Sequence, residues 1–208
     1  MKIKGFQDTI KWYDKHAQEY IAFSYATVQM DVIEKFIAML PSAPKVLDVG
    51  CGPGRDAGIF FQKGVQVTGV DLSKELIKIA KRKNPDISFI EGNFLQLSFE
   101  NGTFDGVWAH AALVHLETIT DVKKALFEFY RILKKKGILN VYVREQSKGE
   151  EFAIVKDKEA NNERFFRYFS MDEMQEYLKE VGFTIRDATY RQSVRRGGLT
   201  WICIFAEK

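Results

Sequence analysis

Residues 46–56 read Val-Leu-Asp-Val-Gly-Cys-Gly-Pro-Gly-Arg-Asp, and this stretch decides the fold. The apolar residues around Asp48 predict a buried strand, and a helical pattern begins behind Gly54. Gly50, Gly52 and Gly54 lie in the turn between the two. Such a turn lets the backbone approach a ligand closely, because no Cβ intervenes and the helix start presents free N–H groups. We therefore expect a ligand at this turn.

The next apolar run, 65–70, ends in Asp71, 23 positions after Asp48. An acidic side chain at the tip of the second strand, about 20 residues beyond a glycine turn, is placed to accept hydrogen bonds from ribose hydroxyls. The glycine spacing is G-x-G-x-G, one residue shorter than the dinucleotide pattern G-x-G-x-x-G. Together these features predict a bound nucleoside, and the spacing argues against a nicotinamide dehydrogenase.

Strands and helices alternate along the chain after Pro41 and Pro44. We expect strands at 46–49, 65–71, 87–91, 104–109 and 138–144, and helices over about 54–63, from Ser73 to Asn84 and from Ile119 to Leu133. The three lysines 134–136 suit the C-terminus of the last helix, with Gly137 closing it. This alternation predicts an α/β fold with a doubly wound parallel sheet.

The two ends of the chain are less regular. Residues 6–40 read as mostly helical, whereas residues 145–169 show no clear pattern. Ser170 and Glu173 form a capping box, which predicts a helix to about residue 181. The runs 183–190 and 199–206 look like strands, and Gly197-Gly198 between them indicates a hairpin or a bulge at the edge of the sheet.

Composition bounds the class of protein. A chain of 208 residues is most simply one domain, and no run approaches the length of a membrane span. Two cysteines, Cys51 and Cys203, and a polar N-terminus predict a cytoplasmic protein without disulfides. We expect a monomer or a homodimer. The net charge of +3 gives no reason to expect a nucleic-acid partner, and three scattered histidines predict no metal site.

Five segments resemble the class I S-adenosylmethionine-dependent methyltransferases, in particular the methyltransferase type 11 group. They are VLDVGCGPG (46–54), VTGVDLS (67–73), EGNF (91–94), FDGVWAHAALVHL (104–116) and LKKKGILNVYV (133–143). The resemblance implies a Rossmann-like seven-stranded sheet of order 3-2-1-4-5-7-6, with strand 7 antiparallel, in a three-layer αβα sandwich. It also implies S-adenosyl-L-methionine as the cofactor and S-adenosyl-L-homocysteine as the product.

The resemblance implies a single methyltransferase domain over 1–208. Residues 1–40 would form a helical N-terminal cap element, 41–145 the cofactor-binding core, and 146–208 the acceptor-side insert and the C-terminal strand pair. The cofactor-binding residues that we expect are Tyr13, Tyr20, Asp48, Gly50, Cys51, Gly52, Gly54, Asp71, Leu72, Asn93, Phe94, Ala109 and His110. The family often has an acid where this chain has Asn93, which still accepts a hydrogen bond but without charge assistance.

Methyl transfer needs a general base only if the acceptor must lose a proton. The resemblance makes His115 the candidate base, because the family often carries a histidine facing the pocket there. Arginines among aromatic side chains between strand 138–144 and the capping box predict acceptor contacts from Arg144, Arg164, Arg167 and Tyr168.

The acceptor class cannot be read from these motifs. Our first hypothesis is an enzyme that methylates an oxygen or nitrogen nucleophile of a small molecule. The alternatives are an RNA- or protein-modifying methyltransferase, and a non-catalytic protein that binds S-adenosylmethionine.

Overall fold

The computed structural model describes residues 5–146, 149–157, 162–193 and 198–208. Its main sheet has seven strands in the order β3-β2-β1-β4-β5-β9-β8. The strands β1 to β5 are parallel, and β9 is antiparallel to both β5 and β8. The bounds are β1 Lys45–Val49, β2 Gln66–Asp71, β3 Ser88–Glu91, β4 Phe104–His110, β5 Leu133–Arg144, β8 Thr184–Gln192 and β9 Thr200–Glu207. The predicted sheet order is therefore confirmed.

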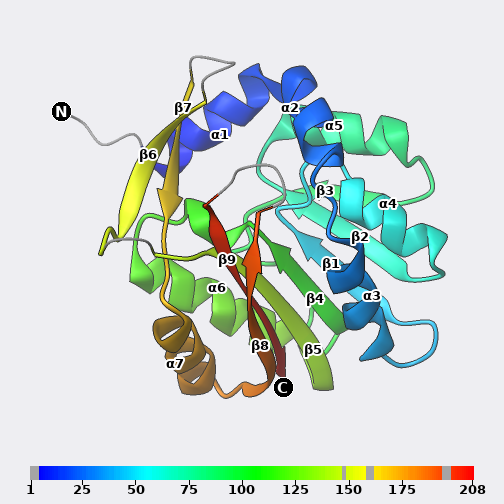
Figure 1. Ribbon diagram of the computed structural model, residues 1–208. Helices are drawn as coiled ribbons and strands as arrows, with labels where there is room; N and C mark the ends of the chain where they lie inside the picture. Colours follow the sequence, from blue (N-terminus) through cyan, green and yellow to red (C-terminus); the bar gives the residue numbers. More distant parts are fainter. Residues whose placement is uncertain (1–4, 147–148, 158–161, 194–197) are drawn as a thin grey trace.

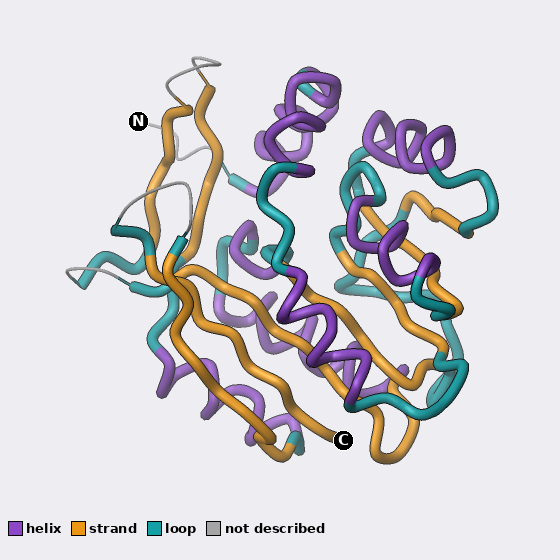
Figure 2. The backbone as a smooth tube through the Cα atoms, turned by 45° about the vertical axis from the view of Figure 1, so that its right-hand side comes forward, coloured by secondary structure: helices purple, strands orange, loops and turns teal. Residues whose placement is uncertain are grey.

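Helices cover both faces of this sheet, which completes the predicted αβα sandwich (Figures 1 and 2). One face packs against α3 (Met30–Ala38), α4 (Arg55–Gln62) and α5 (Lys74–Lys83), and the other against α6 (Ile119–Ile132) and α7 (Met171–Val181). The helices α1 (Phe6–Lys15) and α2 (Ala17–Tyr25) lie at the end of the sheet where the parallel strands finish (Figure 1).

Side chains at the helix termini explain where several helices begin and end. The Ser73 hydroxyl accepts from the backbone N–H of Leu76, which caps α5. Ser170 and Glu173 form the predicted capping box of α7. Gly182 ends α7 in the left-handed region, at φ 112°.

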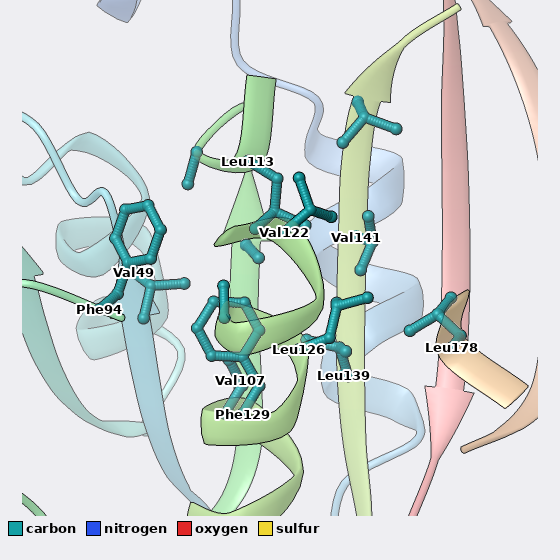
Figure 3. Packing of buried hydrophobic residues seen from close by; sticks show 14 of the residues in the cluster. Val49, Phe94, Val107, Leu113, Val122, Leu126, Phe129, Leu139, Val141 and Leu178 are labelled. Carbon is teal, nitrogen blue, oxygen red and sulfur yellow. The ribbon is translucent and has the colours of Figure 1, made fainter. Parts of the chain in front are cut away.

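The core on the α6 face is a continuous apolar layer (Figure 3). Val122, Leu126 and Phe129 repeat at helical spacing on α6 and are fully buried. They pack against Val107 of β4 and against β5. This packing fixes the parallel strands whose carboxyl ends carry the polar residues discussed below.

The predicted C-terminus of the long helix is wrong. α6 ends at Ile132, and Leu133 to Lys136 already belong to β5. Leu133 is fully buried and lies opposite Phe104, so tertiary pairing overrides the helical preference of the lysines. The ammonium of Lys208 instead donates to the backbone oxygens of Tyr130 (2.7 Å) and Leu133 (2.8 Å) at the helix end.

Residues 145–169, which showed no clear pattern, contain a two-stranded antiparallel hairpin. β6 (Phe152–Asp157) pairs with β7 (Asn162–Arg167), and β7 contacts α1. The backbone N–H of Phe165 donates to the buried Thr9 hydroxyl, 3.2 Å away, which joins hairpin and helix. The edge strand β8 and its neighbour β9 form the predicted hairpin, although Gly197 lies outside the described residues. Within the described ranges, no helix has the length and apolar character needed to cross a membrane.

Candidate active site

A cavity of about 290 Å³ lies at the carboxyl ends of β1, β2, β4 and β5. Residues from α1, α2 and β7 also line it. Thirteen of the residues predicted for the site are in its wall: Tyr13, Tyr20, Asp48, Gly50, Cys51, Gly52, Asp71, Leu72, Phe94, His110, His115, Arg144 and Arg164. Parallel sheets place ligands at this edge, so the position is the expected one.

The glycine turn forms part of this wall. Gly50 has φ +68°, and a Cβ there would lie 2.8 Å from the Cβ of Ala112. Gly52 has φ +53°, and the nearest atom to a Cβ there would be a Tyr20 ring carbon at 3.9 Å. The space above Gly52 is therefore open, and a side chain on this residue would occupy it.

Asp71 is held at the tip of β2 by backbone groups. Its Oδ2 accepts from the N–H of Gly52 (2.9 Å) and its Oδ1 from the N–H of Ser73 (2.8 Å). Burial raises the pKa of this carboxyl, while the hydrogen bonds from Ser73 and Gly52 oppose the shift. Each oxygen keeps a lone pair for a further donor. The carboxylate is thus oriented by the glycine turn and ready to accept hydrogen bonds from a ligand.

Asp48 lies beneath the turn and is buried, and its Oδ2 has no hydrogen-bond partner among the described residues. Burial, followed by the nearby Asp56 carboxylate, raises the pKa of Asp48 well above its usual range. A cationic ligand group would supply the missing partner and favour the ionised form.

Arg55 and Asp56, directly behind the last glycine, form a buried ion pair that the sequence analysis missed. The guanidinium meets the carboxylate through two nitrogens, at 2.6 and 2.7 Å. Burial raises the pKa of Asp56, but the Arg55 guanidinium outweighs this effect and the pKa is lowered to about 2. Arg55 also donates to the backbone oxygen of Ser24 (2.8 Å), and Trp108 Nε1 donates to Asp56 (3.0 Å). The pair therefore ties α2 and β4 to the glycine turn.

Tyr13, His115 and Arg164 meet at the other side of the cavity. His115 Nδ1 lies 2.9 Å from the backbone oxygen of Phe165, and since a carbonyl only accepts, Nδ1 carries the proton. The Tyr13 hydroxyl then donates to His115 Nε2 (3.0 Å) and accepts from Arg164 (3.0 Å). Burial, and secondarily Arg164, lower the pKa of His115 to about 4, so its imidazole is neutral near pH 7.

Five predicted site residues lie outside the cavity wall: Gly54, Asn93, Ala109, Arg167 and Tyr168. Asn93 is exposed, and its side-chain oxygen accepts from the N–H of Leu95 at 2.9 Å. Arg167 donates to the backbone oxygens of Leu116 and Glu117. Gly54 lies behind the turn, where a Cβ would come within 2.9 Å of Phe89.

Other lining residues come from α2 and the chain behind it, and from the C-terminal strand pair, which no local motif marked. Examples are Phe23, Thr27 and Trp201. The sequence did contain a sign of the Arg55–Asp56 ion pair, because these two oppositely charged residues directly follow Gly54. Among the described residues, no group of three or more His, Cys, Asp or Glu side chains is placed to hold a metal ion.

Comparisons with known proteins agree with this geometry. Residues 47–141 match a family model described as a methyltransferase domain. The O-methyltransferase resE of Aspergillus sclerotiorum is 28% identical over 225 residues, covering 98% of this chain and 76% of that protein. A demethylmenaquinone methyltransferase of Renibacterium salmoninarum is 36% identical over 97 residues, covering 47% of this chain. The chain spans only 40% of the length of that relative.

The fold also matches solved structures. The 1,6-didemethyltoxoflavin-N1-methyltransferase of Burkholderia thailandensis, solved with its substrate and S-adenosylhomocysteine, superposes with a TM-score of 0.77 at 23% identity. The match covers 96% of this chain and 86% of that one. The strand order, the glycine turn and the match of residues 47–141 together identify these residues as a class I S-adenosylmethionine-dependent methyltransferase domain.

Proposed function

We propose that the protein transfers a methyl group from S-adenosylmethionine to an oxygen or nitrogen atom of a small molecule. The observation that carries this proposal is the Asp71 carboxylate, which the backbone of the glycine turn holds in the wall of the cavity. The match of residues 47–141 to the methyltransferase domain supports it. The relative from Renibacterium salmoninarum is named for demethylmenaquinone, a small molecule, which supports the small-molecule part of the proposal.

The residues of the cavity fit this cofactor. Gly52 leaves open space for the nucleoside, and Asp71 has free lone pairs for the ribose hydroxyls. Asp48 offers its unpartnered Oδ2 to the ammonium of the methionine portion. Leu72 and Phe94 line the cavity, and we assign them to the adenine. Tyr13 and Tyr20 would close over the bound molecule from α1 and α2.

S-adenosylmethionine supplies a methyl group already activated on a sulfonium. The task left to this chain is to align the acceptor and to exclude water. Tyr13 is 8% exposed and joined to both η1 (Leu113–His115) and β7, so it seals the cavity on the side of α1.

His115 as general base stays a prediction. Its Nε2 already accepts from Tyr13, and a pKa of about 4 makes it a weak proton acceptor near neutral pH. These observations favour a positioning role, in which His115 orients the Tyr13 hydroxyl. An acceptor that attacks without first losing a proton fits such a site best.

A small acceptor also fits the size of the cavity. About 290 Å³ is just below the range for sites that bind one drug-sized ligand, roughly 300–1,000 Å³, and the acceptor would share this space with the cofactor. A macromolecular acceptor would require α1 and the β6–β7 hairpin to move apart. The cytoplasmic location, the oligomeric state and the division at residues 40 and 145 remain proposals from the sequence.

Incubation of the purified protein with isotope-labelled S-adenosylmethionine and metabolite extracts tests the proposal. We expect label in a small product that resists protease and RNase. Label that protease or RNase releases would favour the alternative of a protein- or RNA-modifying enzyme. Normal S-adenosylhomocysteine binding without any labelled product from any of these fractions would favour the non-catalytic alternative.

A further inference from the structure

Four rings from β4, β5 and β9 stack in a row, and three of them, His110, Tyr142 and Trp201, line the cavity. Trp108 and His110 lie with ring centroids 5.2 Å apart, His110 and Tyr142 4.0 Å apart, and Tyr142 and Trp201 5.1 Å apart. The angles between successive ring planes are 8°, 9° and 18°. The four rings therefore share nearly one plane orientation across three strands.

The stack is anchored in the core at Trp108 and ends at Trp201 in the cavity wall. Trp108 is fully buried and its Nε1 is tied to Asp56. Burial lowers the pKa of His110 to about 4, so a neutral imidazole lies between two apolar rings. Trp201, the last ring, is half-buried and lines the cavity. A flat face held in place by the rings behind it binds planar ligands with little loss of side-chain entropy.

A cation lies beside this flat face. Arg144 of β5 is directly opposite Trp201 of β9 in the antiparallel register, so both side chains project from the same side of the sheet. Both line the cavity. The Arg144 guanidinium lies over the Tyr168 ring, 4.5 Å from its centroid, and 6.0 Å from that of Phe166. These two rings orient the guanidinium in the wall that Arg144 shares with Trp201.

We propose that the methyl acceptor is a flat aromatic molecule with an anionic substituent, a carboxylate or phenolate. Its ring lies against Trp201, and its anionic group pairs with the Arg144 guanidinium. This inference rests on the proposed function, because it assigns the acceptor of the same cavity. Guanidinium groups bind carboxylates through paired charge-assisted hydrogen bonds, and indole faces prefer flat rings to puckered ones.

The experiment uses three probes of similar size on the full chain saturated with S-adenosylhomocysteine. Benzoate is flat and charged, cyclohexanecarboxylate is puckered and charged, and benzyl alcohol is flat and neutral. Affinities are measured by NMR titration. We expect benzoate to bind about fivefold more tightly than cyclohexanecarboxylate and about tenfold more tightly than benzyl alcohol.

Two variants assign the effects to residues. Trp201→Leu should remove the preference for benzoate over cyclohexanecarboxylate, and Arg144→Gln should remove its preference over benzyl alcohol. Phe127→Leu, at an exposed position of α6, is the control that should change neither. Equal affinity of the three probes, or binding of none of them, while S-adenosylhomocysteine binds normally would overturn this inference alone. Wild-type protein that fails to bind S-adenosylhomocysteine would overturn the proposed function instead.

Discussion

The two halves of the cavity are built in different ways. On the side that we assign to S-adenosylmethionine, called the donor side here, Asp71 bonds to Gly52, 19 positions away in the chain, within one strand–helix–strand unit. On the opposite side, which we assign to the acceptor and call the acceptor side, Tyr13 bonds to His115 and Arg164, 102 and 151 positions away. The first half uses carboxylate and backbone groups of adjacent parallel strands, whereas the second uses side chains from α1, η1 and β7.

The donor side therefore depends on one local segment of the chain, whereas the acceptor side depends on contacts between segments far apart in the sequence. The donor side needs only β1, β2 and the turn between them to be in register. The acceptor side exists only when α1 and the β6–β7 hairpin have packed onto the sheet. Substitutions on the donor side should therefore mainly weaken ligand binding, and substitutions on the acceptor side should mainly lower the stability of the fold.

The largest expected effect is on the donor side. Asp71→Ala should weaken S-adenosylhomocysteine binding by about 1.5–3 kcal/mol, because charge-assisted hydrogen bonds to the ribose are lost. Calorimetric titration measures this change. Asp105→Ala is the control, since Asp105 also accepts from a backbone N–H, that of Lys45, but belongs to the start of β4. Equal affinity of the Asp71 variant and the wild type would contradict the ribose assignment.

Tyr13→Phe tests the acceptor side. It leaves His115 Nε2 and one Arg164 nitrogen without their hydroxyl partner, so unfolding should become easier by about 1–3 kcal/mol. Urea titration followed by circular dichroism measures this. Tyr190→Phe, at a position 55% exposed, should change stability by less than about 0.5 kcal/mol. If both variants unfold alike, the long-range network does not stabilise the fold.

Acid should weaken the same network. Because burial lowers the folded-state pKa of His115 to about 4 from 6.5, the unfolded chain binds a proton first as the pH falls. The contribution of neutral His115 to the free energy of unfolding is complete above pH 6.5 and is lost as the pH falls towards 4. The loss between pH 7 and pH 5 is on the order of 2 kcal/mol. Asp48, whose pKa is raised, acts in the opposite direction. The test is therefore the difference between wild type and His115→Asn, which should lose less stability on acidification; parallel curves would refute it.

Gly52→Ala and Gly64→Ala form a matched pair with smaller effects. Both glycines have positive φ, +53° and +82°, and a Cβ would meet nothing closer than 3.9 Å at either. Each substitution should cost about 1–2 kcal/mol of stability through backbone strain. Only the Gly52 variant should also bind S-adenosylhomocysteine more weakly, because its methyl group enters the cavity. Identical binding by both variants would argue against a ligand above Gly52.

The predictability of each half follows from the same distinction. The glycine turn and Asp71 could be read because strand, turn and acid lie within 46–71. The sheet order and the family followed from the resemblance, and both are confirmed. The β6–β7 hairpin could not be predicted from the sequence, because its position depends on contacts with α1, more than a hundred residues earlier in the chain.

Two local details show where sequence patterns fail. The lysines 134–136 satisfy the charge preference of a helix end, yet the pairing of Leu133 with Phe104 places them in β5. The aromatic stack from Trp108 to Trp201 joins residues of three strands that each look like ordinary core positions. Its existence depends on the register between β5 and β9, which no local pattern encodes.

The most direct test of the account is calorimetric titration of the wild-type protein with S-adenosylhomocysteine near pH 7. The account predicts saturable binding of one molecule per chain, with a matching rise in melting temperature. Folded protein that gives neither heat of binding nor a thermal shift at millimolar concentrations would contradict it.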